Sequence, residues 1–495
     1  MELNTVDRNG IGVAGSGYDS IPRDAMRQSK LSPSGVIVMR EYVRLGLVAA
    51  AAVVASVTSA SAQGTAPAPA SGKLAIVGGY LIDGNGGVPI QRSVVLVEGD
   101  RITHVGTMAD TPIPTDARVV NASGRTVSPG LNDAHVHVMI LGHGIYDEYF
   151  PKYLGRTREL MPISTKQLLM SGVTSARDLG APLDDILWLK KEIEGGRVVG
   201  PRMFVSGPFL QHSLPPGSAS STAYDALIQA PFRWPVSGAA DARAKTRKLI
   251  AAGVDLIKVI QIAELTSEER LAIAAEARAA GMHIAVHASS TEEVRAAAEM
   301  RAGTIEHMGG GSKSLLDEES IRLIVETGIA YVPTSVVSKV YNITEAYPAR
   351  LDNLRLKQEL PADLYADVQR SVTHFSRLNY FAGRASNRYH AAKVMQLHNA
   401  GVRLLMGTDS GTPMNFHYES AWQEMDLLVS YGMSPMAVIM ASTKWPALLY
   451  GRGRDLGTIQ PGRLADIIVI DGNPLEKISA YKDVVHVIKG GVVYK

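Results

Sequence analysis

The sequence predicts an α/β protein: a (β/α)8 TIM barrel with a small β-sandwich domain built from both chain ends. Within residues 128–454, eight short apolar segments alternate with stretches of helical periodicity, a pattern typical of a parallel barrel. Residues 73–127 and 455–495 hold only strand-like segments separated by glycine turns. The chain has 495 residues and is 46% hydrophobic, so it can bury cores for both parts.

The two chain ends share one pattern of short Val, Ile and Leu runs bounded by Gly, Asn and Asp. Near the start these runs are LAIVGGYLID, SVVLVEGDRITHVG and ARVVNASGRTV, and near the end they are LADIIVID and VVHVIKGGVVYK. Such runs favour β-strands. We therefore expect residues 73–127 and 455–495 to form the small β domain together, and residues 128–454 to form the barrel.

The middle of the chain supplies the strands and helices of the predicted barrel. Three helical patterns, residues 239–253, 266–281 and 291–303, each end at a glycine, as helices commonly do. After a first strand within 128–138, the predicted barrel strands are residues 172–178, 202–207, 254–260, 282–288, 302–307, 328–334 and 402–408. In such barrels the chemistry takes place at the carboxyl ends of the strands.

Residues 39–62 have the features of a secretory signal. Arg40 and Arg44 precede an apolar run of about 13 residues, and Ala60-Ser61-Ala62 is an A-x-A cleavage site. The alternative explanation of this run is a buried helix. The run is too short to span a bilayer of about 30 Å, so stable membrane insertion is not expected. We expect an exported protein, periplasmic or secreted, that starts near Gln63; whether residues 1–38 are translated is open.

The composition restricts partners and metal ligands. The formal net charge is +2, which gives no reason to expect a nucleic acid or a membrane surface as partner. The chain has no cysteine, which excludes disulfides and thiolate metal sites. A metal ion must therefore be held by His, Asp, Glu or a modified Lys.

The segment SPGLNDAHVHV, residues 128–138, carries the first candidate metal ligands. His135 and His137 alternate with Val136, so in a strand both imidazoles lie on one face and can grip one metal ion. Two histidines in a half-buried strand would be the ordinary explanation of an isolated H-x-H. Further polar residues at predicted strand ends favour a metal site instead; they are Lys258, His287, His307 and Asp409.

Lys258 has apolar neighbours on both sides in the sequence LIKVI. It can extend to the barrel rim as a solvated cation. Alternatively, burial and nearby dications lower the pKa of its amine, which then takes up carbon dioxide as a carbamate. That anion would place one oxygen on each of two metals, and the surrounding candidate ligands favour this interpretation.

These residues, in this order, resemble the amidohydrolase superfamily and within it the imidazolonepropionase-like group. That group includes prolidase-like dipeptidases, carboxypeptidase-like enzymes and ochratoxinase-type amide hydrolases. The resemblance covers residues 73–495 and includes the tail GTIQPGRLADIIVIDGNPLEKI. It implies that His135 and His137 hold a buried metal, that carboxylated Lys258 bridges two metals, and that Asp409 ligates the first. His287 and His307 would hold the second metal.

The resemblance implies two divalent metal ions, usually zinc, although N and O ligands also suit manganese, cobalt or iron. Two cations would lower the pKa of a bridging water towards about 7, and the resulting hydroxide would attack a metal-polarised carbonyl. Asp409 would take its proton and pass it to the leaving amine, which makes Asp409 the candidate catalytic residue.

The predicted function is hydrolysis of a C–N bond in a dipeptide or N-acyl amino acid outside the cytoplasm. One alternative is a mononuclear deaminase or cyclic-amide hydrolase. Superfamily deaminases place a glutamate three residues after the fifth-strand histidine, and this chain has Ser290 there. Lys258 also counts against that alternative. A non-catalytic metal- or solute-binding protein is the other alternative, and a homo-oligomer is left open.

Three features are weaker candidates. His212, in a predicted rim loop, is a candidate substrate contact, although a loop histidine is usually only solvent-exposed. Arg177 could hold a substrate carboxylate, but an internal ion pair with Asp178 is the more ordinary expectation. The tyrosine-containing segment 335–392 is helical in pattern, and either a lid or an outer helical layer would explain it.

Overall fold

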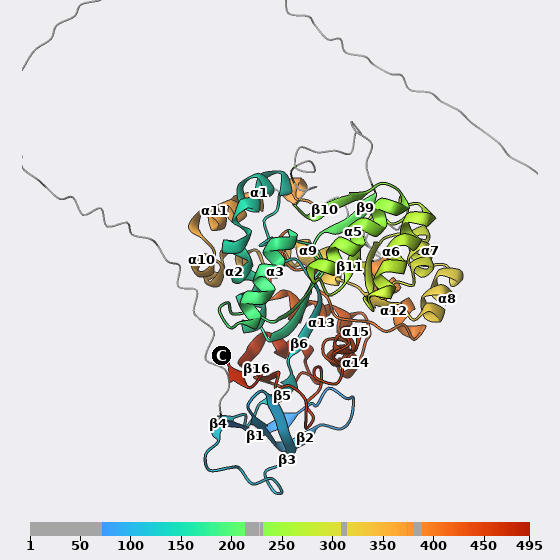
Figure 1. Cartoon of the computed structure of the whole chain (residues 1–495). Coiled ribbons are helices and arrows are strands. Elements are labelled where there is room, and N and C mark those ends of the chain that lie inside the picture. Colours follow the sequence, from blue (N-terminus) through green and yellow to red (C-terminus); the bar gives the residue numbers. More distant parts are fainter. Residues whose placement is uncertain (1–71, 213–226, 228–230, 308–313, 374, 381–388) are drawn as a thin grey trace, which may run out of the picture. The chain divides into compact units, whose positions relative to one another are not determined.

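A computed structural model describes residues 72–212, 227, 231–307, 314–373, 375–380 and 389–495 (Figure 1). These described residues belong to one compact unit. The leader and the secretory signal, together residues 1–62, lie outside the described residues, so both stay predictions.

The two chain ends pair in one sheet. Its strands are β1 (Lys73–Leu81), β2 (Ile90–Glu98), β3 (Arg101–Thr107), β4 (Arg118–Asn121), β5 (Thr126–Pro129), β15 (Ile467–Ile470), β16 (Val484–Lys489) and β17 (Val492–Val493). Their order is β17-β16-β15-β5-β1-β2-β3, and β4 also pairs with β1. The antiparallel pair of β15 with β5 joins the two ends. Hydrogen bonds thus connect all eight strands in a single sheet, where we expected a sandwich.

Alternation of side chains gives this sheet an apolar layer on both faces. In β1, Ile76 belongs to one buried cluster, with Val95 of β2, and its neighbour Val77 belongs to another, with Val94. Successive residues of a strand point to opposite faces, so the near-continuous apolar runs of the sequence are what a sheet covered on both faces requires.

The middle of the chain forms parallel sheets. Strands β6 (Leu131–Val136), β7 (Val173–Asp178) and β8 (Arg202–Val205) make one sheet of three strands. The second sheet has the order β10-β9-β11-β12-β13-β14. Its strands are β9 (Phe209–His212), β10 (Arg233–Val236), β11 (Ile257–Val259), β12 (Ile284–Ala288), β13 (Thr304–His307) and β14 (Ala330–Val332). All these pairings are parallel, which confirms an α/β fold.

The predicted eighth strand, residues 402–408, is only partly regular. This segment and the two residues after it pair through single parallel bridges, Leu404 with Tyr331 of β14 and Ser410 with Val136 of β6. Backbone hydrogen bonds follow it on both sides, including Leu405 N to Tyr331 O at 2.9 Å and Thr408 N to His135 O at 3.1 Å. The segment therefore lies between β14 and β6, the position that an eighth barrel strand would take.

Two of the helices between the strands begin at capping boxes. Helix α6 (Ser267–Ala279) begins with a capping box of Thr266 and Glu269, and α7 (Thr291–Met300) with one of Ser290 and Glu293. Helix α5 (Gly238–Ala252) ends at left-handed Gly253, but α7 ends at left-handed Arg301 and not at the expected glycine. Helices α5, α6 and α7 lie side by side, and α7 packs on β12 (Figure 1).

The remaining α-helices include those of the long segment 335–392, whose described part is helical as predicted. They are α1 (Tyr146–Tyr153), α2 (Thr157–Met170), α3 (Leu183–Glu194), α8 (Glu318–Thr327), α9 (Ser335–Ala346), α10 (Leu354–Glu359), α11 (Ala362–Ser371), α12 (His390–Asn399), α13 (Ser420–Ser430), α14 (Pro435–Ala441) and α15 (Lys444–Leu449). Strands β9 and β10 were not predicted, because their residues fall in a stretch read as loop.

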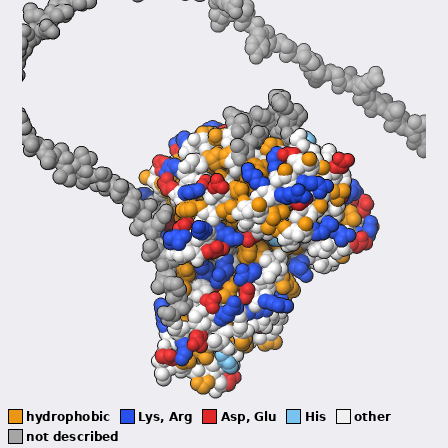
Figure 2. Space-filling model, viewed as in Figure 1, with side chains coloured by type: hydrophobic (Ala, Val, Ile, Leu, Met, Phe, Trp, Pro, Cys, Tyr) orange, Lys and Arg blue, Asp and Glu red, His pale blue; other side chains and the backbone are white. Residues whose placement is uncertain are grey.

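The surface mixes charges of both signs. Figure 2 shows Lys and Arg side chains interspersed with Asp and Glu on the visible face of the described residues. Among the described helices, none is both long and apolar enough to cross a membrane.

The buried imidazole of His143 should make the fold sensitive to acid. Its Nδ1 accepts a hydrogen bond from the Ile145 N–H at 3.1 Å, and burial lowers its pKa to about 4. The unfolded chain takes up this proton near the ordinary histidine pKa of about 6.5, so acid favours unfolding. Below that pH the free energy of unfolding should fall by about 1.4 kcal/mol per pH unit for this group.

Urea unfolding at pH 7.5 and 5.5 without added metal measures this contribution. In His143→Asn the amide oxygen can still accept from Ile145 but cannot titrate, so the variant should lose less stability on acidification than the wild type. Equal losses in the two proteins would contradict the assignment.

Candidate metal centre

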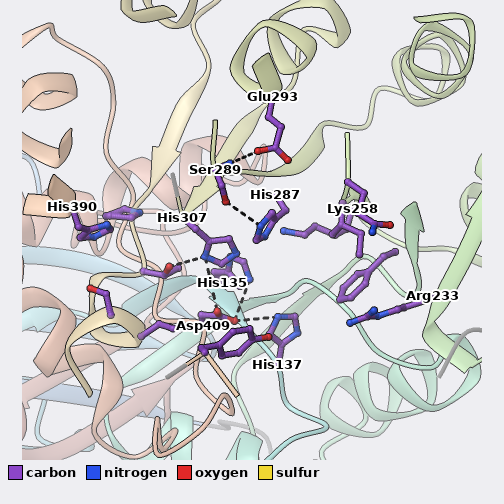
Figure 3. A pocket seen from close by; sticks show the side chains of 18 of the residues that line it. His135, His137, Arg233, Lys258, His287, Ser289, Glu293, His307, His390 and Asp409 are labelled. Atoms are coloured by element: carbon purple, nitrogen blue, oxygen red, sulfur yellow. Dashed lines mark hydrogen bonds and ion pairs between the residues drawn. The ribbon is translucent and has the colours of Figure 1, made fainter. Parts of the chain in front are cut away.

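The six residues predicted as metal ligands line one cavity of about 600 Å³ (Figure 3). All of them come from the carboxyl-terminal parts of parallel strands or from the residue that follows. They are His135 in β6 and His137 directly after it, Lys258 in β11, His287 in β12, His307 at the end of β13, and Asp409 after the segment 402–408. The structure thus brings together side chains that the sequence scatters from position 135 to position 409.

Asp409 lies at the centre of the cluster. Its Oδ1 is 3.5 Å from His135 Nε2 and 3.2 Å from His137 Nε2, and its Oδ2 is 4.0 Å from His307 Nδ1. The backbone N–H groups of Thr408 and Asp409 both donate to the carbonyl of His135. The backbone segments that carry His135 and Asp409 are therefore hydrogen-bonded to each other.

Glycines allow this close approach. A Cβ on Gly407 would lie 2.3 Å from Val332 Cγ1 and 3.0 Å from His135 Cβ. Gly411 adopts φ +101°, and a Cβ there would lie 2.4 Å from the carbonyl oxygen of His137. The two glycines of the sequence G-T-D-S-G around Asp409 are thus required by the packing of the site.

Burial keeps most of the imidazoles neutral. It holds the pKa of His135 and of His307 well below the ordinary value and lowers that of His287 to about 4. Burial would also lower the pKa of His137, but the Asp409 carboxylate outweighs it and raises that pKa. Neutral imidazoles are the form that binds metal ions.

Lys258 is buried within the cluster and does not extend to solvent. Its side chain is 2% exposed, and its Nζ has no hydrogen-bond partner among the described residues. Burial lowers its pKa to about 8. Figure 3 shows the side chain extending towards His287. After burial, its positive charge further lowers the pKa of His135, His287 and His307, and at His137 it opposes the larger effect of Asp409.

Behind His135 lies a carboxylate that sequence reasoning missed. Glu306 Oε2 is 2.8 Å from His135 Nδ1, and Glu306 Oε1 accepts a hydrogen bond of 2.7 Å from Arg177 Nη2. The side chains of all three residues are fully buried. An acidic residue inside the apolar strand sequence TIEH was the signal that could have indicated it.

The two residues nominated for substrate contact do not line the cavity. Arg177 is fully buried, which corrects the expectation that it could hold a substrate carboxylate. Its internal ion pair exists, but the partner is Glu306 and not Asp178, which accepts hydrogen bonds from two backbone N–H groups. His212 ends β9 and is half-buried.

Backbone strain is concentrated at this cavity. Non-glycine residues with positive φ that line it are Gln261 (52°), His307 (74°), Thr334 (46°), Tyr380 (67°) and Asp409 (53°). Such conformations cost about 1–3 kcal/mol each and persist at functional sites, where the surrounding structure holds them. Two predicted ligands, His307 and Asp409, are among them.

The cavity has two chemically different ends. Near β10 and β11 its wall contains Arg233, Gln261 and Glu264; beyond β14 it contains Val337, Ser338, Tyr341, Tyr380 and His390. These strands lie towards opposite edges of the second parallel sheet, and Figure 3 shows Arg233 and His390 on opposite sides of the cluster. Part of the segment 335–392 thus forms cavity wall, which the sequence could not specify.

The cluster fits a metal site. Ligand atoms of His135, His307 and Asp409 all lie within 4.8 Å of one another. In the described part of the chain, His135 Nε2 and Asp409 Oδ1 are buried without a hydrogen-bond partner although they lie close together. Buried polar groups normally have partners, and atoms that lack one but face a common point suit a shared ion. Imidazole and carboxylate donors without thiolates match zinc and related divalent metals.

Comparison with known proteins indicates the class of protein to which this chain belongs. The chain is 26% identical to ochratoxinase from Aspergillus niger over 95% of each sequence. Among solved structures it resembles that of a Xaa-Pro dipeptidase with bound methionine in the active site, with a TM-score of 0.67 at 24% identity over 86% of this chain and 100% of the other. It also resembles molinate hydrolase, with a TM-score of 0.68 at 24% identity over 86% and 95% of the two chains. These likenesses imply a TIM barrel plus a small domain.

The parallel strands, the cluster at their carboxyl ends and these relatives define a hydrolase of C–N bonds. Residues 126–494 match the Amidohydrolase family, and the chain belongs to that family. Its relatives indicate the imidazolonepropionase-like group, which confirms the resemblance drawn from the H-x-H, Lys, His, His and Asp residues.

Metal removal should destabilise the protein. A ligand that binds only the folded state at 100 times its Kd adds about 2.7 kcal/mol, so zinc returned to chelated protein should raise Tm. His135→Asn should lose this response, while His212→Asn, outside the cavity, should keep it. Differential scanning fluorimetry with elemental analysis measures both; a wild-type Tm indifferent to chelation and to zinc would count against the site.

Proposed function

We propose that this protein is a binuclear metal-dependent hydrolase that cleaves the amide bond of dipeptides or N-acyl amino acids. The observation that carries the proposal is the buried amine of Lys258, which has no hydrogen-bond partner among the described residues and lies amid four histidines. As an ammonium it repels metal ions, and among the described residues it forms neither a hydrogen bond nor a salt bridge. As a carbamate it becomes an anion with two oxygens, suited to two cations.

The carbamate requires a neutral amine and carbon dioxide. Burial lowers the pKa of Lys258 to about 8, so an appreciable fraction of the amine is neutral near pH 7. Its lone pair attacks the carbon of carbon dioxide, a new N–C bond forms, and one proton leaves the nitrogen for solvent. The product changes the charge of this side chain from positive to negative.

The other ligands divide into two groups around Lys258. His135, His137 and Asp409 would hold one ion, and their close distances support that grouping. His287 and His307, whose ring centroids are 4.7 Å apart, would hold the second. Bound divalent ions, of which zinc is the expected metal, would supply the activated water and the Lewis acid for hydrolysis.

Asp409 is the group placed to move the proton. Amide hydrolysis forms a C–O bond from water, breaks the C–N bond and transfers one proton from the water to the leaving nitrogen. Asp409 lies among three histidines at the cavity wall, so its carboxylate can accept that proton and donate it onward.

The substrate class rests on the cavity and on the relatives. Arg233 supplies a cation near one end, while Tyr341 and Tyr380 supply aromatic surface near the other. An N-acyl amino acid or dipeptide has a carboxylate on one side of its amide and a second substituent on the other, which suits such a cavity. The dipeptidase and ochratoxinase likenesses support the same class.

The parallel strands support a closed barrel. Residues 403–410 contact β14 on one side and β6 on the other, so hydrogen bonds run from the second parallel sheet to the first. Between the sheets, Asp255 N, just before β11, donates to Val205 O of β8. We infer eight segments in barrel order, with the first and last adjacent.

The alternatives predict different behaviour at Lys258. In a mononuclear deaminase or cyclic-amide hydrolase this amine bridges nothing. The position where a deaminase would carry its glutamate is Ser290, whose hydroxyl caps helix α7. A non-catalytic binder would hold metal without turnover, and membership of a hydrolase family counts against it.

Lys258→Met should reduce the bound metal from two ions to one or none and abolish amide hydrolysis. Lys393→Met is the matched control, because Lys393 is also buried but does not line the cavity. Elemental analysis and a panel of dipeptides and N-acyl amino acids provide the measurements. Full activity of Lys258→Met would favour the one-metal alternative, and two metals without turnover on any amide would remove the substrate assignment.

Export is a separate part of the proposal. Residues 39–62 carry a charged start, an apolar run and the A-x-A site, so the mature chain should begin at Gln63. Expression in a Gram-negative host followed by fractionation and N-terminal sequencing tests it. Ala60→Leu, which removes the small residue required at the cleavage site, should leave the precursor uncleaved; a cytoplasmic, unprocessed wild type would refute export.

A further inference from the structure

The contact between Glu306 and His135 determines which nitrogen of His135 is available. Neutral imidazole carries one N–H, and the hydrogen bond made by one nitrogen decides the role of the other. The carboxylate of Glu306 is ion-paired with Arg177, so its Oε2, 2.8 Å from Nδ1, offers that nitrogen only an acceptor. Nδ1 must then carry the hydrogen, and Nε2 presents its lone pair towards Asp409, 3.5 Å away.

Glu306 is itself fixed by Arg177, which reaches it from β7. Arg177 Nη2 donates to Glu306 Oε1 at 2.7 Å, and Arg177 Nε donates to the carbonyl of Ala134 at 2.6 Å. Arg177 Nη1 donates to Thr304 Oγ1 at 3.1 Å and also contacts His283 Nε2 at 3.3 Å. The guanidinium has donors only, all three nitrogens are engaged, and no rotation exchanges their roles.

We propose that Arg177 and Glu306 form a tautomer lock that holds His135 with hydrogen on Nδ1 and a free lone pair on Nε2. Glu306 is then a positioning residue for the metal centre, and Arg177 fixes the carboxylate. The inference rests on the proposed role of His135 as a metal ligand. Groups of this kind behind a ligating histidine typically change metal affinity about 10- to 100-fold when removed.

The lock predicts an unusual effect of a nearly isosteric change. In Glu306→Gln the amide oxygen must face Arg177, because Arg177 offers only donors. The amide NH2 group is then turned to His135 Nδ1 and requires that nitrogen to accept. The hydrogen of His135 moves to Nε2, the nitrogen that should bind metal.

Removing Arg177 should reverse that effect. In Arg177→Met/Glu306→Gln the amide can turn its oxygen towards His135, since the remaining neighbour of Oε1, the Thr304 hydroxyl, can donate or accept. The double variant also removes both members of the buried ion pair at once, so it leaves no unpaired charge in the core. The tautomer expected for the double variant is that of the wild type.

Imidazole ¹⁵N NMR on the mature, histidine-labelled protein without metal reads the tautomer directly, with His135 assigned by its loss in His135→Gln. We expect hydrogen on Nδ1 in the wild type, on Nε2 in Glu306→Gln and again on Nδ1 in the double variant. Zinc titration should show an affinity about 10- to 100-fold weaker in Glu306→Gln and recovery in the double variant. Glu424→Gln, a buried carboxylate outside the cavity, should change neither quantity.

Wild-type tautomer and zinc affinity in Glu306→Gln would overturn the proposal, as would a double variant that keeps hydrogen on Nε2. Should Glu306→Gln not fold, Glu306→Asp and the double variant decide: both must show hydrogen on Nδ1. These readouts need no substrate. Absence of amide hydrolysis with the predicted tautomers would therefore refute the proposed function and leave the lock intact.

Discussion

The ion pair of Arg177 and Glu306 is the constraint on which the rest of this structure depends. Neither side chain is exposed, so its desolvation must be offset by geometry and by additional hydrogen bonds. Arg177 provides them by contacting residues on β6 and β13 from its own place on β7. Breaking such a pair typically costs about 3–5 kcal/mol, because one buried charge remains. The ion pair that orients His135 thus also links the parallel strands β6, β7 and β13 to one another.

A second consequence is electrostatic. The cavity contains a buried cation, Lys258, and imidazoles whose pKa burial depresses, with Asp409 as the carboxylate at the centre. The Arg177–Glu306 pair adds no net charge to this region. Within the ligand cluster itself, divalent cations can therefore be balanced by Asp409 and by the anion that Lys258 becomes, so the state of that amine affects how many ions the site can hold.

The sequence indicated the six candidate ligands that line the cavity but little of the rest of the site, for a physical reason. The candidate ligands lie at strand ends, where polar residues interrupt apolar runs such as LIKVI, so the local pattern singles them out. Glu306 and Arg177 also interrupt such runs, but their role depends on a partner on another strand. For Arg177 the sequence pointed to Asp178, which is the neighbouring residue. Strands β9 and β10 were missed because FLQH and RWPV are short and Pro235 weakens the strand signal.

The residues proposed for the chemistry and those proposed for substrate specificity lie in different parts of the fold. The ligand cluster is carried by strands whose backbone is fixed from both sides, and the strained φ angles of His307 and Asp409 persist because those strands hold them. The cavity ends are formed by Arg233 before α5 and by Tyr341 in α9, which lie outside the ligand-bearing strands. These segments can change without disturbing the lock behind His135. A relative at 26% identity is therefore a better guide to the type of bond that is cleaved than to the groups that the substrate carries on either side of that bond.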